Sequence, residues 1–328
     1  MAESSIVSHS DLSDFAHQKV NLGTDPLNRY RTQVRNLQES LERYIQDNPE
    51  YDLVKTLRAG SVAKGTALST INDMDLAIYV RPSDQTTNEA QLLNWLRERL
   101  LEAKPPNVDP DQIPIPDSGS HCVRISYKGS GLDVDVVPII HTGEDDDRGY
   151  LIPKDGGGAR VLTSIPLHLA FIHRRKELSE NFTQVVRFIK WWVRQRKGEN
   201  NEFRFKSFMV ELICAHLADQ GKIDLDDYRL AMADFFLYII TSQLKKRIAF
   251  TDNYHLEELP EPTGNPIEIF DPVNPQNNVA SRYTEYQRQL IVEEAQKAFD
   301  AISGAMPAVT KERAVQLWKK VLGPSFNP

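Results

Sequence analysis

The sequence predicts an α+β fold made of two lobes with a cleft between them. Short apolar strand patterns separated by turn residues fill the N-terminal half, whereas long helical patterns fill the C-terminal half. This order of strands and then helices is typical of α+β architecture, and clefts between such lobes commonly bind ligands. We therefore expect a first domain at 1–160, which includes the N-terminal helices, and a helical domain at 161–328.

The composition sets limits on the class of protein. The chain has 328 residues, with 39 basic and 46 acidic side chains and a net charge of −7, which argues against a general nucleic-acid coat. No run reaches the ~18 apolar residues of a membrane span, and the first residues lack the basic and apolar regions of a signal peptide. The two cysteines lie far apart in the sequence. We expect a cytoplasmic protein with no membrane partner.

The elements of the N-terminal half follow from apolar periodicity and turn residues. A short helix is expected at 11–20, and a long one at 26–47, where apolar residues recur at steps of three and four. Four strands follow, at 52–59, 74–80, 121–127 and 132–138. A helix is expected at 88–103, and the proline-rich stretch 105–118 is a loop.

The C-terminal half reads as mostly helical after a polar loop at 141–160. A second long loop is expected at 252–277, which contains five prolines. Periodicity predicts helices at 166–177, 181–197, 206–220, 226–248, 279–303 and 310–321.

A glycine–serine turn follows the first strand. The stretch Gly60–Thr66 superficially resembles a P-loop, but Thr66 follows Gly65 with no lysine between them, so that interpretation fails. A strand, a tight turn and a short helix remain, and such a turn can direct backbone N–H groups and the Ser61 hydroxyl at a phosphate. A plain strand-to-helix connection is the alternative.

Two strands carry acidic residues in alternation with apolar ones. Side chains alternate faces along a strand, so Asp73 and Asp75 share one face, and Asp133 and Asp135 share another. Neighbouring carboxylates repel each other unless a cation lies between them, and Mg²⁺ prefers such oxygen ligands. We assign the functional role to Asp135, which apolar residues surround, and a structural one to Asp133. Solvated aspartates are the alternative for the first pair.

The order of these three segments resembles the nucleotidyltransferase superfamily that shares the DNA polymerase β-type core. The ungapped stretch GSVAKGTALSTINDMDLAIYV at 60–80 carries most of the resemblance. It implies a polymerase β-like core with a mixed sheet and a long N-terminal helix. It also implies that Asp73, Asp75 and Asp135 are catalytic and hold two Mg²⁺ ions, for which Mn²⁺ may substitute.

The C-terminal half narrows the resemblance to one branch of that superfamily. FRFKSFMVELI at 203–213 and DPVNPQNNVA at 271–280 are similar to segments of oligoadenylate synthases, cyclic GMP-AMP synthase and the bacterial CD-NTases, closest to the clades called CdnC and CdnD. The resemblance implies synthesis of a cyclic oligonucleotide second messenger from NTPs, with ATP favoured and cyclic tri-AMP a possible product, in anti-phage (CBASS) signalling. It implies as partners a HORMA-domain activator, a Trip13-like ATPase, an effector that binds the product, and DNA as an activating ligand.

The resemblance also implies residues that bind the nucleotide. Lys190 and Ser207 match positions that hold the β- and γ-phosphates, and Phe208, where the family often has tyrosine, matches the residue that stacks on the base. Arg187, Lys190 and Arg194 lie on one flank of their helix and would concentrate positive charge there. The full expected set is Gly60, Ser61, Lys64, Lys190, Lys206, Ser207 and Phe208. A lysine lying along the helix and a phenylalanine in the core are the alternatives.

Three other functions share parts of this pattern. An RNA-tailing polymerase uses the same carboxylates but usually has a basic RNA-binding surface. A small-molecule nucleotidyltransferase shares the core, but DPVNP at 271–275 argues against it. An inactive nucleotide-binding module would not need all three carboxylates.

Overall fold

The computed structural model describes residues 6–47, 50–83, 89–154 and 159–328, which form two units. The sheet unit consists of Leu22–Gly65 and Thr70–Ala170, as far as they are described. The helical unit consists of the described residues through Asn21, the short segment Thr66–Ser69 and Phe171–Pro328. This division differs from the single boundary near residue 160 expected from the sequence, because the first helices group with the C-terminal ones.

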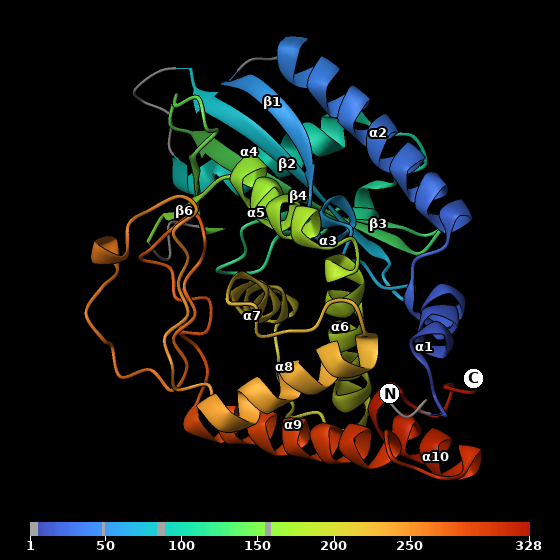
Figure 1. Ribbon diagram of the computed structural model, residues 1–328. Coiled ribbons are helices and arrows are strands. Elements are labelled where there is room, and N and C mark those ends of the chain that lie inside the picture. The colour runs from blue at the N-terminus through green and yellow to red at the C-terminus, as the bar shows by residue number, and fades with distance from the viewer. Residues whose placement is uncertain (1–5, 48–49, 84–88, 155–158) are drawn as a thin grey trace. The chain divides into compact units, whose positions relative to one another are not determined.

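The sheet unit is built on a mixed sheet of six strands (Figure 1). Its strands are β1 (Tyr51–Ala59), β2 (Asp73–Pro82), β3 (Val123–Tyr127), β4 (Leu132–His141), β5 (Gly149–Leu151) and β6 (Val161–Thr163). The order is β1-β2-β4-β5-β6, and β3 pairs with the first half of β4. Strands β2 and β4 are parallel, and the other pairs are antiparallel. The prediction of a polar loop at 141–160 was wrong in part, because this segment contains the three-residue strand β5.

One face of the sheet is covered by helices α2 (Thr24–Asp47) and α4 (Leu92–Ala103), and Figure 1 shows α2 lying along it. Alternate residues of β2, beginning with Met74 and Leu76, pack into the core beneath these helices. Because side chains alternate, Asp73 and Asp75 lie on the other face. Short helical turns complete the unit: α3 (Gly60–Lys64), η2 (Glu89–Gln91) and η3 (Pro110–Gln112).

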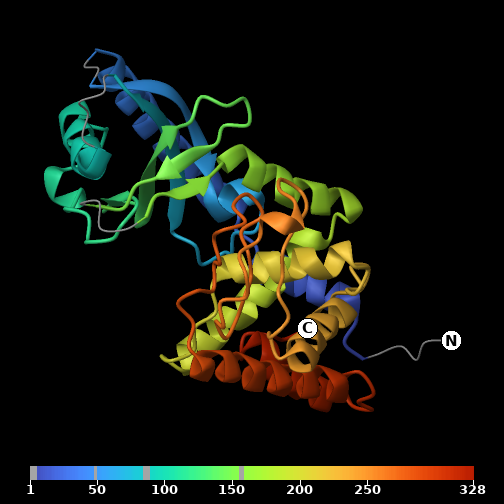
Figure 2. The same cartoon turned by 90° about the vertical axis from the view of Figure 1, so that its left-hand side faces the viewer.

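The helical unit has a core of its own, centred on α6 (Phe182–Glu199), in which Trp192 is fully buried. Helix α9 packs against α8 and α10 (Figure 2). The other helices are α1 (His9–Phe15), η1 (Ala16–Val20), α5 (Ile165–Leu178, shared with the sheet unit), α7 (Ser207–Asp219), α8 (Tyr228–Ser242), η5 (Leu256–Glu258), α9 (Glu285–Ala305) and α10 (Lys311–Leu322).

Two helix boundaries differ from those expected. Helix α8 ends at Ser242, six residues before the predicted end, because Gln243 and Leu244 adopt left-handed backbone with φ of 52° and 51°. Helix α9 begins at Glu285, where Thr284 caps it by accepting a hydrogen bond from the Gln287 N–H. No helix among the residues searched is both long and apolar enough to cross a membrane.

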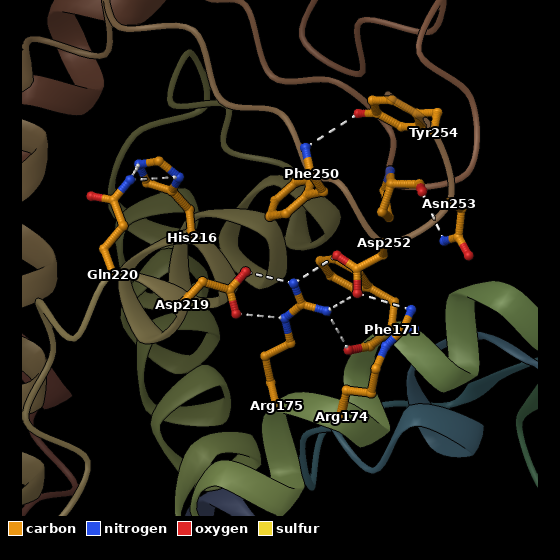
Figure 3. A network of polar contacts seen from close by, with 11 residues as sticks. Phe171, Arg174, Arg175, His216, Asp219, Gln220, Phe250, Asp252, Asn253 and Tyr254 are labelled. Atoms are coloured by element: carbon orange, nitrogen blue, oxygen red, sulfur yellow. Dashed lines mark hydrogen bonds and ion pairs between the residues drawn. The ribbon is translucent and has the colours of Figure 1, made fainter. Parts of the chain in front are cut away.

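A buried arginine fixes the long loop between α8 and α9 to the helices (Figure 3). Arg175 on α5 is 6% exposed and makes paired hydrogen bonds to Asp219 at the end of α7 and to Asp252 in the loop. It also donates to the Phe171 carbonyl oxygen, and its guanidinium lies 3.9 Å from the centre of the Phe171 ring. One side chain therefore ties three segments together.

Candidate functional site

The acidic residues singled out in the sequence lie side by side on neighbouring strands. In the parallel pairing of β2 with β4, Asp75 is opposite Asp135 and Asp73 is opposite Asp133. All four project from the face that α2 and α4 do not cover, because Met74 between the first two packs beneath those helices. The folded sheet therefore brings together carboxylates that are 60 residues apart in the sequence.

Burial and mutual repulsion disfavour the charged forms of the first two aspartates. Partial burial, together with the charges of Asp135 and Asp73, raises the pKa of Asp75 to about 6 despite the opposing charges of Lys64 and Arg124. The pKa of Asp73 is also raised, chiefly by burial. A cation bound next to Asp75 would stabilise the charged form of its carboxylate, which burial and the neighbouring carboxylates disfavour.

The glycine–serine turn touches this acidic group directly. Gly60 begins the short helix α3 with a φ of 70°, and Gly65 ends the helix in left-handed conformation. A Cβ atom on Gly60 would lie 1.6 Å from the Oδ2 atom of Asp75. Only a residue without a side chain leaves room for this carboxylate. Ser61 and Lys64 lie in the same turn and are half-buried.

We expect Gly60→Ala to cost far more activity than Gly65→Ala. Both glycines have positive φ, so either change strains the backbone by about 1 kcal/mol. Only Gly60→Ala also displaces the Asp75 carboxylate, since an added Cβ at Gly65 meets nothing within 4 Å. A displacement of this kind costs about a hundredfold in rate. Initial rates of nucleotide incorporation measure the difference, and equal losses in the two variants would contradict the role of Gly60.

Asp135 is held by a residue that the sequence analysis missed. The Arg124 guanidinium on β3 donates through Nε to Oδ1 and through Nη2 to Oδ2, both at 2.8 Å. Ser126, which is opposite Asp133 in the same hairpin, donates a single hydrogen bond from its hydroxyl to Asp133 Oδ1 at 2.7 Å. The hairpin contained the signal, because residues equally distant from the turn 128–131 face each other and Arg124 is directly opposite Asp135.

The predicted metal ligands are neighbours, but they are not arranged as a metal site. Over the ranges that the structure describes, no three acidic, histidine or cysteine side chains form a group that could hold a metal ion. Asp135 has both oxygens bound to Arg124 instead. The donor set fits a hard divalent cation chemically, because it offers carboxylate oxygens that repel each other. The role of Asp73, Asp75 and Asp135 as ligands stays a prediction.

Lys190 lies in a buried network of the helical unit. It is 5% exposed, and its ammonium donates to Glu211 Oε1 at 2.6 Å and to Thr66 Oγ1 at 2.9 Å. Thr66 in turn donates to Glu211 at 2.7 Å. The expectation of a basic flank on α6 was therefore wrong for Lys190, because this side of the helix packs against α7. Its predicted contact with phosphate stays untested.

The other expected nucleotide residues lie at the start of α7. Ser207 is the first residue of the helix and is exposed, so its N–H group is one of those left without a partner inside the helix. Lys206 precedes it, and its ammonium donates to the Val279 carbonyl oxygen at 2.8 Å. Phe208 is half-buried against the helical core, which leaves part of its ring accessible. Their binding roles stay predictions.

Comparison with known proteins identifies relatives over the whole chain. Residues 7–164 match the family described as Second Messenger Oligonucleotide or Dinucleotide Synthetase domain. The chain is 43% identical over 322 residues to the cyclic AMP-AMP-AMP synthase of Escherichia coli MS 115-1, covering 98% of both proteins. It is 31% identical to the CBASS oligonucleotide cyclase CdnC of Escherichia coli KTE188, covering 94% of both.

The fold of this chain is similar to that of solved structures of such enzymes. CdnC of E. coli MS115-1, in complex with HORMA-deltaN, has a TM-score of 0.88 and 43% identity, and the match covers 98% of this chain and 99% of that one. Vibrio cholerae DncV cyclic AMP-GMP synthase shares the fold, with a TM-score of 0.68 at 12% identity over 98% and 97% of the two chains. Nucleotidyltransferases of this kind generally use divalent metal ions. The chain therefore belongs to the CD-NTase family of CBASS nucleotidyltransferases, which make cyclic oligonucleotide second messengers from NTPs.

Proposed function

We propose that this enzyme joins ATP molecules into cyclic tri-AMP. The observation that carries the proposal is the 43% identity to a cyclic AMP-AMP-AMP synthase along 98% of both chains. The same protein's structure with ATP, which covers 98% of this chain at a TM-score of 0.87, supports ATP as the substrate. At this level of identity over the full length, the pocket for the base is expected to be shared as well as the fold.

Asp73, Asp75 and Asp135 would hold two Mg²⁺ ions, and Mn²⁺ would substitute for them. Such ions, when bound, neutralise the triphosphate and make the attacking ribose hydroxyl more acidic. The chain itself supplies the ordered carboxylates, and the β2–β4 register fixes Asp75 next to Asp135. In each transfer the ribose oxygen forms a bond to the α-phosphorus, and the bond to pyrophosphate breaks. A carboxylate oxygen of Asp135 takes up the hydroxyl proton.

Two segments would bind the nucleotide. The turn with Gly60, Ser61 and Lys64 adjoins the carboxylates, and its hydroxyl and ammonium groups suit phosphate oxygens. Ser207 would present the N-terminus of a 13-residue helix to phosphate, with the positive charge of Lys206 beside it. Phe208 would stack on the base. The Lys190 ammonium already donates to Thr66 and Glu211, so it would contact phosphate only by giving up or sharing one of these hydrogen bonds.

The relatives also suggest partners. CdnC of E. coli MS115-1 was solved in complex with a HORMA protein, and we extend a HORMA-domain activator to this chain. A Trip13-like ATPase, an effector that binds the product, and DNA as an activating ligand remain part of the same proposal. An enzyme of this kind is expected to need its activator for full turnover.

Mass spectrometry of the reaction products tests the proposal. The purified chain is incubated with all four NTPs, Mg²⁺ and a HORMA-domain protein as activator, and the product is treated with phosphatase and nuclease. We expect a resistant cyclic trinucleotide made of AMP. A tailed RNA, a nucleotide-tagged small molecule or the absence of any product with the activator present would each contradict the proposal.

Removal of the metal tests the role of the carboxylates. We expect excess chelator to reduce synthesis to background, because divalent ions supply several kcal/mol of transition-state stabilisation in two-metal enzymes. Added Mg²⁺ or Mn²⁺ is expected to restore synthesis, whereas Ca²⁺, which prefers a larger and more flexible set of ligands, is not. Full activity in excess chelator would rule out the assignment.

A further inference from the structure

Arg124 and Asp135 form a two-point ion pair across the β3–β4 hairpin. They are directly opposite each other in the antiparallel register, and the two N···O distances are both 2.8 Å. Such paired hydrogen bonds fix the orientation of a carboxylate as well as neutralising it. The plane of the Asp135 carboxylate is therefore set by Arg124.

The two partners differ in how easily they can move. The Arg124 side chain is 51% exposed and comes from β3, which among the described strands pairs only with β4. The Asp135 side chain is 17% exposed and comes from β4, which has neighbours on both sides. Guanidinium does not lose its proton in proteins, so Arg124 can release Asp135 only by moving away. Of the two side chains, Arg124 is therefore the one with more room to move.

The pair competes with the arrangement that a divalent ion requires. A metal ion would have to share oxygens that both accept hydrogen bonds from Arg124, and a hydrogen bond from a cation weakens an oxygen's donation of its remaining lone pair. A guanidinium that stayed in place would also put a like charge next to the bound ion.

We propose that Arg124 is a positioning residue that neutralises Asp135 in the metal-free enzyme and must withdraw from it when a divalent ion binds. The inference deepens the proposed function and rests on its metal-binding role for Asp135. Arg124 sets the metal concentration at which the site fills, because part of the binding energy is used to break its ion pair. The released guanidinium remains within reach of the site.

The experiment measures Mn²⁺ binding without nucleotide, by electron paramagnetic resonance of the free ion. We expect Arg124→Gln to tighten binding about tenfold, since a unit charge a few ångströms from a divalent ion is removed in a largely aqueous setting. Arg124→Lys keeps the charge but loses the paired geometry, so we expect it to remain closer to the unmodified protein. It also serves as a second variant if the first folds poorly.

Lys128→Gln is the matched control. Lys128 lies in the turn of the same hairpin and pairs with Asp111 at 2.7 Å, so this change removes the same charge from the same element without freeing Asp135. We expect its Mn²⁺ affinity to change by less than about twofold, because exposed and screened charges at longer range contribute little.

The outcomes separate this inference from the proposed function. Unchanged or weaker Mn²⁺ binding in Arg124→Gln overturns the competition, provided that the unmodified protein binds Mn²⁺ and Asp75→Asn does not. No Mn²⁺ binding by the unmodified protein overturns both the inference and the metal-binding role on which it rests. Tighter binding in Lys128→Gln of the same size as in Arg124→Gln also overturns it, because the effect would then be one of general charge.

Discussion

Replacing Asp73 and Asp75 together with asparagine is expected to abolish oligonucleotide synthesis while the protein remains folded. Both side chains lie on the face of the sheet that α2 and α4 do not cover, and neither contributes to the core beneath those helices. The amide keeps the size of the carboxylate but loses the charge that a divalent ion requires. We expect synthesis to fall by at least about a thousandfold, in line with the several kcal/mol that metal ions contribute.

The same change is expected to stabilise the metal-free protein at neutral pH. Folding raises the pKa of Asp75 from 3.8 to about 6, so the folded state binds its proton more tightly than the unfolded state. The stability from this proton is complete below the unfolded pKa near 4 and is lost as the pH rises through about 6. At pH 7 the charged carboxylate therefore destabilises the fold, on the order of 2 kcal/mol.

Two measurements check this prediction. Urea unfolding between pH 4 and pH 8 in the presence of chelator should show a loss of stability between about pH 4 and pH 6 in the unmodified protein and a flatter profile in the variant. Asp133→Asn is the control, since that residue shares the face but accepts a hydrogen bond from Ser126. It should retain synthesis within a few-fold. Synthesis by the double variant would disprove the catalytic assignment.

Arg175→Met is expected to destabilise the helical unit by about 3 kcal/mol, at the low end for a buried ion pair, because Asp252 keeps its contact with Arg174 and Asp219 is 36% exposed. Methionine fills much of the same volume, so the main loss is that of the ion pairs to Asp219 and Asp252, the latter 10% exposed. Removing one partner of a buried ion pair costs this much because the remaining charge stays poorly solvated. The stacking of the guanidinium on Phe171 is also lost.

Arg174→Met provides the matched control. Arg174 is the neighbouring residue on α5, contacts the same Asp252 at 2.9 Å and is 46% exposed. An exposed ion pair contributes about 1 kcal/mol or less, so this variant should unfold close to the unmodified protein. Urea unfolding followed by circular dichroism measures both. Equal stability of the two variants would mean that Arg175 does not fix the loop.

Local patterns predicted the strands and the carboxylates, because they depend on residues close in the sequence. The alternation in DMDLAIYV at 73–80 placed Asp73 and Asp75 on one face, and the hairpin at 128–131 set the register that includes Asp135. The parallel pairing of β2 with β4 was not readable from periodicity. The family resemblance implied a mixed sheet, and the structure confirms it.

The partners of the basic residues were beyond reach of the sequence. Periodicity placed Lys190 on a flank of α6, but its acceptors Thr66 and Glu211 are 124 and 21 residues away. An ammonium that looks exposed on a helical wheel is buried once another helix packs over it. Glu211, an acid within the apolar run of α7, was the available sign that a buried cation lies nearby.

The chain passes between the two units four times, after Asn21, Gly65, Ser69 and Ala170. Cutting the gene at any one of these points would not give two self-sufficient products. A fragment that begins at residue 171 would lack the buried Leu12 and Phe15, and also Thr66, to which Lys190 donates. Neither unit can therefore be expressed as one continuous segment of the sequence. Reconstituting the enzyme from two polypeptides would separate segments that belong to the same unit.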